Sequence, residues 1–162
     1  MIEVVVVGLA CDPGGTQVRL LLKEREGRRV LPIGIGSFEA EAIGDYLDGT
    51  HNPRPLAHDL LVQVLGRLDA RVQRVEVSAL VHDIFFAWLV LEQAGQQLKI
   101  DSRPSDAMAI ALRAGAPIYV AAAVLDQAGL VPRAPDKPAV SVDQSRLSVF
   151  TAFIETLNTE DL

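Results

Sequence analysis

The sequence predicts an α+β fold in which two duplicated β-β-β-α units form a mixed, mostly antiparallel sheet or partial barrel with packed helices. Patterns typical of three strands precede a helical pattern, and the same order returns in the second half of the chain. Residues 39–43 (Glu-Ala-Glu-Ala-Ile) resemble residues 106–110 (Asp-Ala-Met-Ala-Ile), 67 positions further on. Hydrophobic residues make up 49% of the 162 residues, which is enough for a buried core.

The first half begins with an almost uninterrupted run of β-branched residues, which is typical of a buried strand. Gly36 and Ser37 open a helix with Ser37 as a candidate N-cap, and Asp48 and Gly49 end it. The expected elements are strands at 2–9, 17–23 and 29–35 and a helix between 37 and 48.

The second half starts after residues 52–55 (Asn-Pro-Arg-Pro), a rigid connector because each proline disfavours helix at the residue before it. His82-Asp83 and Ala94-Gly95 are candidate tight turns between strands. The expected elements are a helix at 56–68, strands at 72–81, 84–91 and 97–101, a helix at 106–114, a strand at 118–120 and a helix at 121–128.

The domain organisation follows from composition along the chain. We predict one domain at residues 1–130, a proline-rich linker at 131–140 and a C-terminal helical tail at 141–162. A single cysteine, Cys11, excludes an intramolecular disulfide framework. The uncharged residues 4–11 are far too few to span a membrane, so we expect a cytoplasmic protein with no membrane partner. The net charge of −6 argues against a basic nucleic-acid coat protein.

Residues 101–106 (Asp-Ser-Arg-Pro-Ser-Asp) form a first candidate site, where a strand ends and a helix begins. Pro104 favours the first turn of a helix, and Ser105 can cap it. The free N–H groups of a helix start and the guanidinium of Arg103 suit a phosphate, with Asp101 or Asp106 as a metal ligand or base. A structural helix start, held by an Arg–Asp bridge, explains the same residues, and the residues alone favour it.

His58 and Asp59 form a second candidate, in the first turn of the helix after the connector. A histidine near the positive end of a helix dipole is disfavoured as imidazolium, which suits a general base or a metal ligand. The alternative is structural: Asp59 caps its helix and His58 bonds to the backbone. Adjacent helical residues point about 100° apart, so the two are a poor chelating pair by themselves.

Four separated motifs are similar, in order and spacing, to those of the bifunctional nuclease domain family. They are residues 31–36 (Leu-Pro-Ile-Gly-Ile-Gly) with Glu39-Ala40, residues 54–60 (Arg-Pro-Leu-Ala-His-Asp-Leu), residues 103–107 (Arg-Pro-Ser-Asp-Ala) and residues 116–120 (Ala-Pro-Ile-Tyr-Val). The similarity covers about residues 1–130. Three places depart from the family pattern: Gly34 stands where a large residue, often Trp, is usual, Ala57 where Thr is usual, and His82-Asp83 where the turn more often carries Asp-Gly or Asp-Asn.

The resemblance implies a mixed α+β fold and a nuclease that hydrolyses the phosphodiester bonds of DNA and RNA without sequence specificity. In a metal-assisted scheme, His58 is the candidate base, and three acids serve as catalytic residues and as ligands of Mg²⁺ or Mn²⁺: Glu39, Asp59 and Asp106. Three residues are expected to bind the substrate: Arg54, Arg103 and Ser105. A pseudo-two-fold repeat would either bring Glu39 and Asp106 together or leave each to cap its own helix at opposite ends of the sheet.

An alternative function is a non-catalytic module that binds a protein or an anionic ligand. The acidic composition and the absence of a strong catalytic string, such as a phosphate loop or a Gly-X-Ser-X-Gly elbow, support this alternative. In either case we expect a homo-oligomer, because very apolar strands with an uncovered sheet edge favour association.

Overall fold

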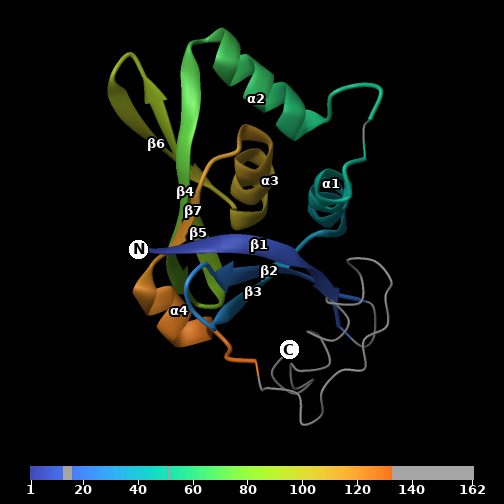
Figure 1. Ribbon diagram of the computed structural model, residues 1–162, viewed down its shortest axis with the longest axis vertical. Coiled ribbons are helices and arrows are strands. Elements are labelled where there is room, and N and C mark those ends of the chain that lie inside the picture. The colour runs from blue at the N-terminus through green and yellow to red at the C-terminus, as the bar shows by residue number, and fades with distance from the viewer. Residues whose placement is uncertain (13–15, 51, 133–162) are drawn as a thin grey trace.

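The computed structural model describes residues 1–12, 16–50 and 52–132, and Figure 1 shows their arrangement. Within this part of the chain, seven strands form one sheet in the order β3-β2-β1-β7-β4-β5-β6. The strands are β1 (Ile2–Cys11), β2 (Val18–Glu24), β3 (Val30–Ile35), β4 (Ala70–Val81), β5 (Ile84–Gln93), β6 (Gln96–Ser102) and β7 (Ile118–Val120). The helices are α1 (Ser37–Leu47), α2 (Ala57–Arg67), α3 (Pro104–Ala114) and α4 (Ala122–Ala128).

The sheet consists of two antiparallel three-stranded units joined by a short central strand. Strands β1, β2 and β3 form one unit and β4, β5 and β6 the other. Strand β7 lies between them, antiparallel to β1 and parallel to β4. The curled sheet and its helices confirm the predicted α+β class with a mixed, mostly antiparallel sheet (Figure 1). The two units have the same order of elements, and their origin by duplication stays a prediction.

Small residues allow α3 to lie against both the sheet and α1. The two similar segments begin α1 and α3, and the alanines of both are buried: Ala40, Ala42, Ala107 and Ala109. Helix α3 contacts α1, α2, β4 and β5, so it is the most central helix (Figure 1). A methyl group is the smallest side chain that still fills a core position, and it lets two backbones approach closely.

Both predicted tight turns are present and connect the strands of the second unit. His82 and Asp83 have φ of 49° and 63°, and Ala94 and Gly95 have φ of 49° and 76°. Positive φ at both central residues is the geometry of the two-residue hairpin turn that matches the twist of its strands. The turns therefore set the pairing beside them, Val81 with Ile84 and Gln93 with Gln96, whereas the β4–β5 register shifts twice further from its turn.

Two capping predictions are wrong. Helix α1 has Gly36 as its N-cap, and Ser37 is its first helical residue. Helix α3 begins at Pro104, two residues earlier than expected, with Arg103 as N-cap in place of Ser105. The fixed φ of proline suits the first helical position, so Pro104 begins the helix and the cap falls on Arg103, two residues before Ser105. The predicted linker and tail fall almost entirely on residues 133–162, which lie outside the described residues.

Among the described residues, no helix combines the length and apolarity that crossing a membrane requires.

The C-terminus of α3 gives a stability prediction. Gly115 has φ of 64° and open space around its α-carbon. We expect Gly115→Ala to lower the free energy of unfolding by about 1 kcal/mol, because only the left-handed backbone opposes the methyl group. Gly66 is the matched control, because it lies inside α2 and a Cβ atom there would also have no neighbouring atom within 4 Å. Gly66→Ala should raise the free energy of unfolding by about 0.5–1 kcal/mol. Urea denaturation measures both, and a loss at Gly66 would contradict this account.

Candidate functional site at the starts of three helices

Helices α1, α2 and α3 each have an acid at their third position: Glu39, Asp59 and Asp106. At this position a carboxylate lies near the free N–H groups and the positive end of the helix dipole. Asp59 caps its own helix, because its Oδ2 accepts a hydrogen bond from the N–H of Leu56, the N-cap residue, at 2.8 Å. The other two acids contact a shared side chain from the start of α3.

That side chain is Arg103, which joins the starts of α1 and α3. Its Nη2 lies 2.7 Å from Oε1 of Glu39, and its Nε lies 2.7 Å from Oδ2 of Asp106. Nη2 also donates to Oδ1 of Asp106 at 3.1 Å. Of the two arrangements left open by the sequence, the structure therefore shows convergence. The Arg103 side chain is still 66% exposed, so another molecule can reach its guanidinium.

Gly36 makes room for Glu39 at the start of α1. A Cβ atom at Gly36 would lie 2.3 Å from Oε2 of Glu39, closer than any real contact. Any side chain at this position would require the flexible end of Glu39 to shift. Gly36, the second glycine of the Leu-Pro-Ile-Gly-Ile-Gly motif, therefore leaves free the space that the Glu39 carboxylate occupies.

His58, the second residue of α2, extends the cluster to a third helix. Its Nε2 lies 3.3 Å from Oδ1 of Asp106. Burial alone would raise the pKa of Asp106, but hydrogen bonds with Arg103 and His58 more than offset it, so the pKa lies below its usual value. The carboxylate is ionised at neutral pH and can accept a hydrogen bond from Nε2–H, which leaves Nδ1 of His58 as the proton acceptor of the ring.

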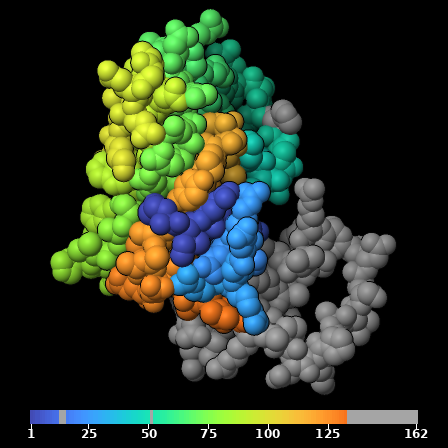
Figure 2. Space-filling model, turned by 60° about the vertical axis from the view of Figure 1, so that its left-hand side comes forward, coloured from blue at the N-terminus to red at the C-terminus, as the bar shows by residue number. Residues whose placement is uncertain are grey.

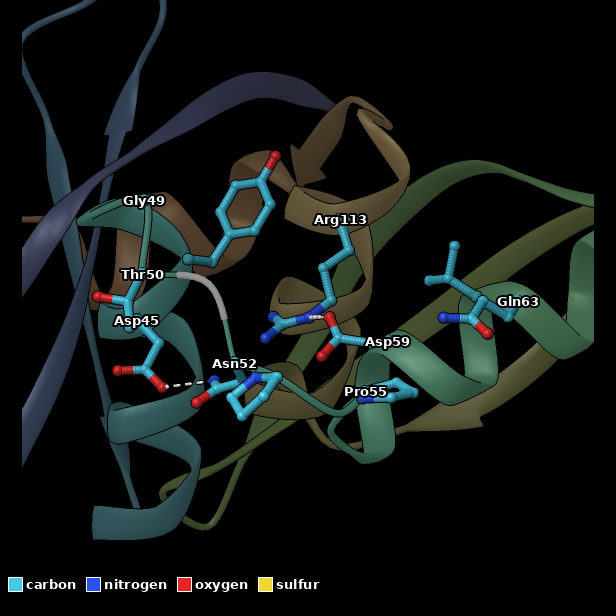
Figure 3. A pocket seen from close by; sticks show the side chains of 11 residues that line it. Asp45, Gly49, Thr50, Asn52, Pro55, Asp59, Gln63 and Arg113 are labelled. Atoms are coloured by element: carbon cyan, nitrogen blue, oxygen red, sulfur yellow. Dashed lines mark hydrogen bonds and ion pairs between the residues drawn. The ribbon is translucent and has the colours of Figure 1, made fainter.

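Asp59 points to a different partner, Arg113 in the last turn of α3 (Figure 3). Nε of Arg113 lies 2.5 Å from Oδ1 of Asp59, and its Nη2 donates to the carbonyl of Ala42 in α1 at 3.1 Å. The Arg113 side chain is only 7% exposed, with its guanidinium 5.6 Å from the ring centre of Tyr46. Burial would raise the pKa of Asp59, but Arg113 and the Leu56 N–H hold it below its usual value.

Two hollows flank this region. One, of about 840 Å³, is lined by Arg103 and Ser105 at the start of α3 and by Arg19, Gly34 and Gly36 from β2, β3 and the start of α1. Gly34 is one of the residues that line this hollow, and it has no side chain to occupy it. The other hollow, of about 560 Å³, lies between the end of α1 and the start of α2, beside Tyr46, Asn52, Asp59 and Arg113 (Figure 3).

The structure thus brings together some of the predicted site residues and leaves others apart. Four residues form one connected cluster: Glu39, His58, Arg103 and Asp106. Ser105 is buried beside it and lines the larger hollow. Arg54 is exposed in the connector between α1 and α2 and forms no ion pair with any described residue, and Asp101 lies exposed on β6.

The arrangement does not gather the three acids as one set of metal ligands. No group of three His, Cys, Asp or Glu side chains suited to a metal ion occurs in the described part of the chain. Glu39 and Asp106 face the same guanidinium, whereas Asp59 is held by Arg113. The predicted use of Mg²⁺ or Mn²⁺ stays a prediction.

Sequence reasoning missed Arg113, which links three helices. A signal was present, because Arg113 is seven residues after Asp106 in a helix whose intervening residues are mostly apolar. Residues seven apart on a helix share a face. In a largely buried helix, a charged residue needs a partner of opposite charge. When it shares a face with a candidate site residue, it therefore indicates an ion pair near that site.

Residues 20–133 match the bifunctional nuclease domain model, which is more than half of the chain. The chain belongs to the bifunctional nuclease domain family, as its motifs predicted.

Relatives of this chain include bacterial and plant proteins. An uncharacterized protein of Mycobacterium tuberculosis (strain H37Rv) is 40% identical over 161 residues, which cover 98% of this chain and 96% of that protein. Bifunctional nuclease 1 of Oryza sativa subsp. indica is 29% identical over 131 residues, 77% of this chain and 40% of the rice protein. Bifunctional nuclease 2 of Arabidopsis thaliana is 29% identical over 105 residues, 62% of this chain and 32% of that protein. The chain spans less than half the length of these plant relatives.

The buried position of Arg113 gives a second prediction. We expect Arg113→Ala to lower the free energy of unfolding by about 2–4 kcal/mol, since it leaves Asp59 and the Ala42 carbonyl without their partner. Arg113→Lys keeps the positive charge but not the planar guanidinium. We expect it to lower the free energy of unfolding by about half as much as Arg113→Ala does. Urea denaturation of the three proteins measures this, and equal stability of wild type and Arg113→Ala would refute the structural role.

The lowered pKa of Asp106 predicts how stability depends on pH. A carboxyl whose pKa is lower in the folded state contributes stability above its unfolded pKa of about 3.9 and loses it as the pH falls through the folded value. Asp106→Asn removes this pH-dependent contribution to stability. As the pH is lowered from neutral to about pH 2, the urea midpoint of the variant should therefore fall less than that of wild type. Asp101→Asn, on exposed β6, is the control that should keep the wild-type slope.

Proposed function

We propose that this chain hydrolyses the phosphodiester bonds of single-stranded or otherwise exposed DNA and RNA without reading their sequence. The observation that supports this most directly is the exposed Arg103 beside a histidine–carboxylate pair, at the point where three helices begin. Membership of the family adds support, and two plant relatives are named bifunctional nucleases.

In this proposal His58 is the general base. With a proton on Nε2 directed at Asp106, Nδ1 can accept the proton of a water molecule that attacks phosphorus. As the new P–O bond forms, the bond from phosphorus to the leaving sugar oxygen breaks, and that oxygen takes a proton from solvent water. Asp106 orients the ring and stabilises the imidazolium that forms, because an ionised carboxylate favours the charged ring. Glu39 and Asp106 hold the planar guanidinium of Arg103 in one orientation, and its exposed edge binds a phosphate oxygen.

The charge of the cluster requires a further positive group when substrate binds. Glu39 and Asp106 together outweigh Arg103, so a phosphodiester meets a net negative cluster while His58 is neutral. Arg54 lies exposed in the connector before α2, apart from the cluster, and is proposed to supply that charge through its own contact with the substrate. A divalent cation is the other source, and carboxylate oxygens are the ligands it prefers.

A cleavage assay tests the catalytic role of His58. We expect His58→Asn to cut labelled single-stranded DNA and RNA oligonucleotides about 10²–10⁴-fold more slowly, the usual contribution of a general base. His82→Asn is the matched control, because His82 lies in the β4–β5 turn and asparagine tolerates its positive φ. Arg103→Ala should weaken substrate binding as well as turnover.

Three outcomes decide between parts of the proposal. Equal activity of His58→Asn and wild type would refute the base assignment. Loss of activity with a chelator, restored by Mg²⁺ or Mn²⁺, would assign the missing positive charge to a cation. Activity that separates from the protein on a second column would favour the alternative of a non-catalytic binding module. That alternative is supported by the pairing of all three helix-start acids with arginines, which is also what a structural clamp requires.

A further inference from the structure

The larger hollow, of about 840 Å³, is bordered by parts of the chain that are distant in sequence. Its lining comes from β2 and β3, from the β4–β5 hairpin, from the start of α3 and from residues around the end of α4. Figures 1 and 2 both show α4 beside β3, and Leu130, just after α4, bridges to Val30 at the start of β3. The volume lies within the ~300–1,000 Å³ typical of ligand sites. We call this space the α3 hollow.

Ser105, the second residue of α3, places a hydroxyl without a partner at the α3 hollow. The residue is only 7% exposed, yet it lines the hollow. Its hydroxyl forms no hydrogen bond with any residue that the structure describes. Buried polar groups of folded proteins normally have a partner, because an unpaired one costs stability. The hydroxyl is therefore placed to bond an oxygen of a ligand in the hollow.

The backbone at the start of α3 adds further donors beside this hydroxyl. No side chain caps the helix. The carbonyl of Arg103 accepts the first intrahelical hydrogen bond from the N–H of Ala107 at 3.1 Å, so the N–H groups of Ser105 and Asp106 precede that bond. Unpaired N–H groups at a helix start attract an anion. Together with the exposed guanidinium of Arg103, they suit a phosphate oxygen.

Arg19 brings a second guanidinium to the α3 hollow from β2. Its Nη2 donates to Oε1 of Gln17 at 3.1 Å, which orients the side chain. Arg19 pairs directly with Gly34 on β3, the last strand of the sheet on this side. Directly opposite residues of an antiparallel pair point to the same face. Because Gly34 has no side chain, β3 places nothing between Arg19 and the hollow at this position.

Neither packing nor backbone conformation requires a glycine at position 34. A Cβ atom there would meet a single side-chain atom of the described residues within 4 Å, Nε2 of Gln17 at 3.7 Å, which is an ordinary contact. Gly34 is not among the glycines with a positive φ. A larger side chain at this position would therefore occupy the α3 hollow beside Arg19 without straining the strand.

The chemistry of the lining favours a nucleotide over other ligands. Among the described residues that line the α3 hollow, two are arginines, Arg19 and Arg103, and one is an acid, Asp83. This balance favours an anion. The hairpin adds apolar side chains that a phosphate alone would not contact, but against which a sugar and a base can pack: Leu80, Ile84 and Phe85.

We propose that the α3 hollow binds the nucleotide next to the cleaved bond of a single-stranded DNA or RNA, and that Arg19 and Ser105 hold its phosphate. The inference rests on the proposed function, which puts the cleaved phosphodiester beside His58 and Arg103. Arg103 also lines the hollow, so the strand passes from the point of cleavage into it. Only a single strand has unpaired bases whose faces can pack against the hairpin.

Fluorescence anisotropy with a labelled single-stranded oligonucleotide measures this binding apart from cleavage, in the His58→Asn variant of the full chain. Adding Arg19→Gln should weaken binding about tenfold, because a hydrogen bond to a charged group is lost. The slope of log affinity against log salt should also become shallower by about one, as for any lost phosphate contact. Ser105→Ala should weaken binding less, since it removes a neutral hydrogen bond.

Arg71→Gln is the matched control for Arg19→Gln. Arg71 is an arginine of the same sheet, on β4, that pairs with Glu92 and does not line the α3 hollow. Its side chain is 74% exposed, and an exposed ion pair contributes little to stability. The control should bind the oligonucleotide as the His58→Asn background does and keep its salt dependence.

A neutral linkage in the oligonucleotide identifies the phosphate that Arg19 contacts. Each phosphate is replaced in turn by a methylphosphonate, which has no negative charge. At one linkage, next to the bond that the active protein cuts, this change should weaken binding when Arg19 is present and have no further effect in Arg19→Gln. A purely structural role of Arg19 predicts the same loss in both proteins at every linkage.

Gly34→Val tests the hollow without removing any of its polar groups. Valine is favoured over glycine in a strand, so the free energy of unfolding should not fall. The side chain should nevertheless weaken binding of the oligonucleotide severalfold, because it fills the space beside Arg19. Urea denaturation of the same variant checks that its fold is intact.

The possible results separate this inference from the proposed function. Unchanged binding in Arg19→Gln or in a stable Gly34→Val variant, or equal methylphosphonate losses with and without Arg19, would overturn the inference. Inorganic phosphate or a 5′-mononucleotide that binds as tightly as the oligonucleotide would also overturn it, because the hollow would then take a free phosphate. A wild-type chain that binds the strand through Arg19 but never cuts it would refute the proposed function and support the α3 hollow as a strand-binding site.

Discussion

The burial of helix α3 between the sheet and helices α1 and α2 is the constraint on which the candidate site depends. Small residues make this position possible, since Ala107, Ala109 and Ala111 are fully buried. Once α3 is fixed, its two arginines reach fixed neighbours. Arg103 at its start reaches Glu39 of α1, and Arg113 at its end reaches Asp59 of α2. The site is thus a consequence of helix packing.

The two arginines of α3 have the same chemistry but different surroundings, and this difference separates their roles. Arg113 is almost fully buried and meets a carboxylate, a backbone carbonyl and an aromatic ring. A cation so enclosed holds helices together and has little freedom to bind anything else. Arg103 is largely exposed and borders a hollow. Removing Arg113 therefore affects stability most, and removing Arg103 affects binding most.

The element pattern was largely predictable because it depends on local chemistry. Apolar and β-branched runs, one of them alternating with polar residues, indicated the strands, and the pairs His82-Asp83 and Ala94-Gly95 indicated their turns, as the structure confirms. Helix caps were less predictable. A serine competes with its neighbours for the cap position, and at α3 the preference of Pro104 for the first helical position prevailed.

The sequence by itself determined the strand and helix order, the turns, the family and the residue types of the candidate site. These follow from periodicity, turn propensity and motifs that each lie within a few residues of one another. Only the tertiary structure decided which acids share an arginine. Glu39, Asp59 and Asp106 occupy the same third position of their helices, yet two meet Arg103 and one meets Arg113. Side-chain partners across helices depend on how the helices pack, and that geometry is not encoded in the spacing of residues along the chain.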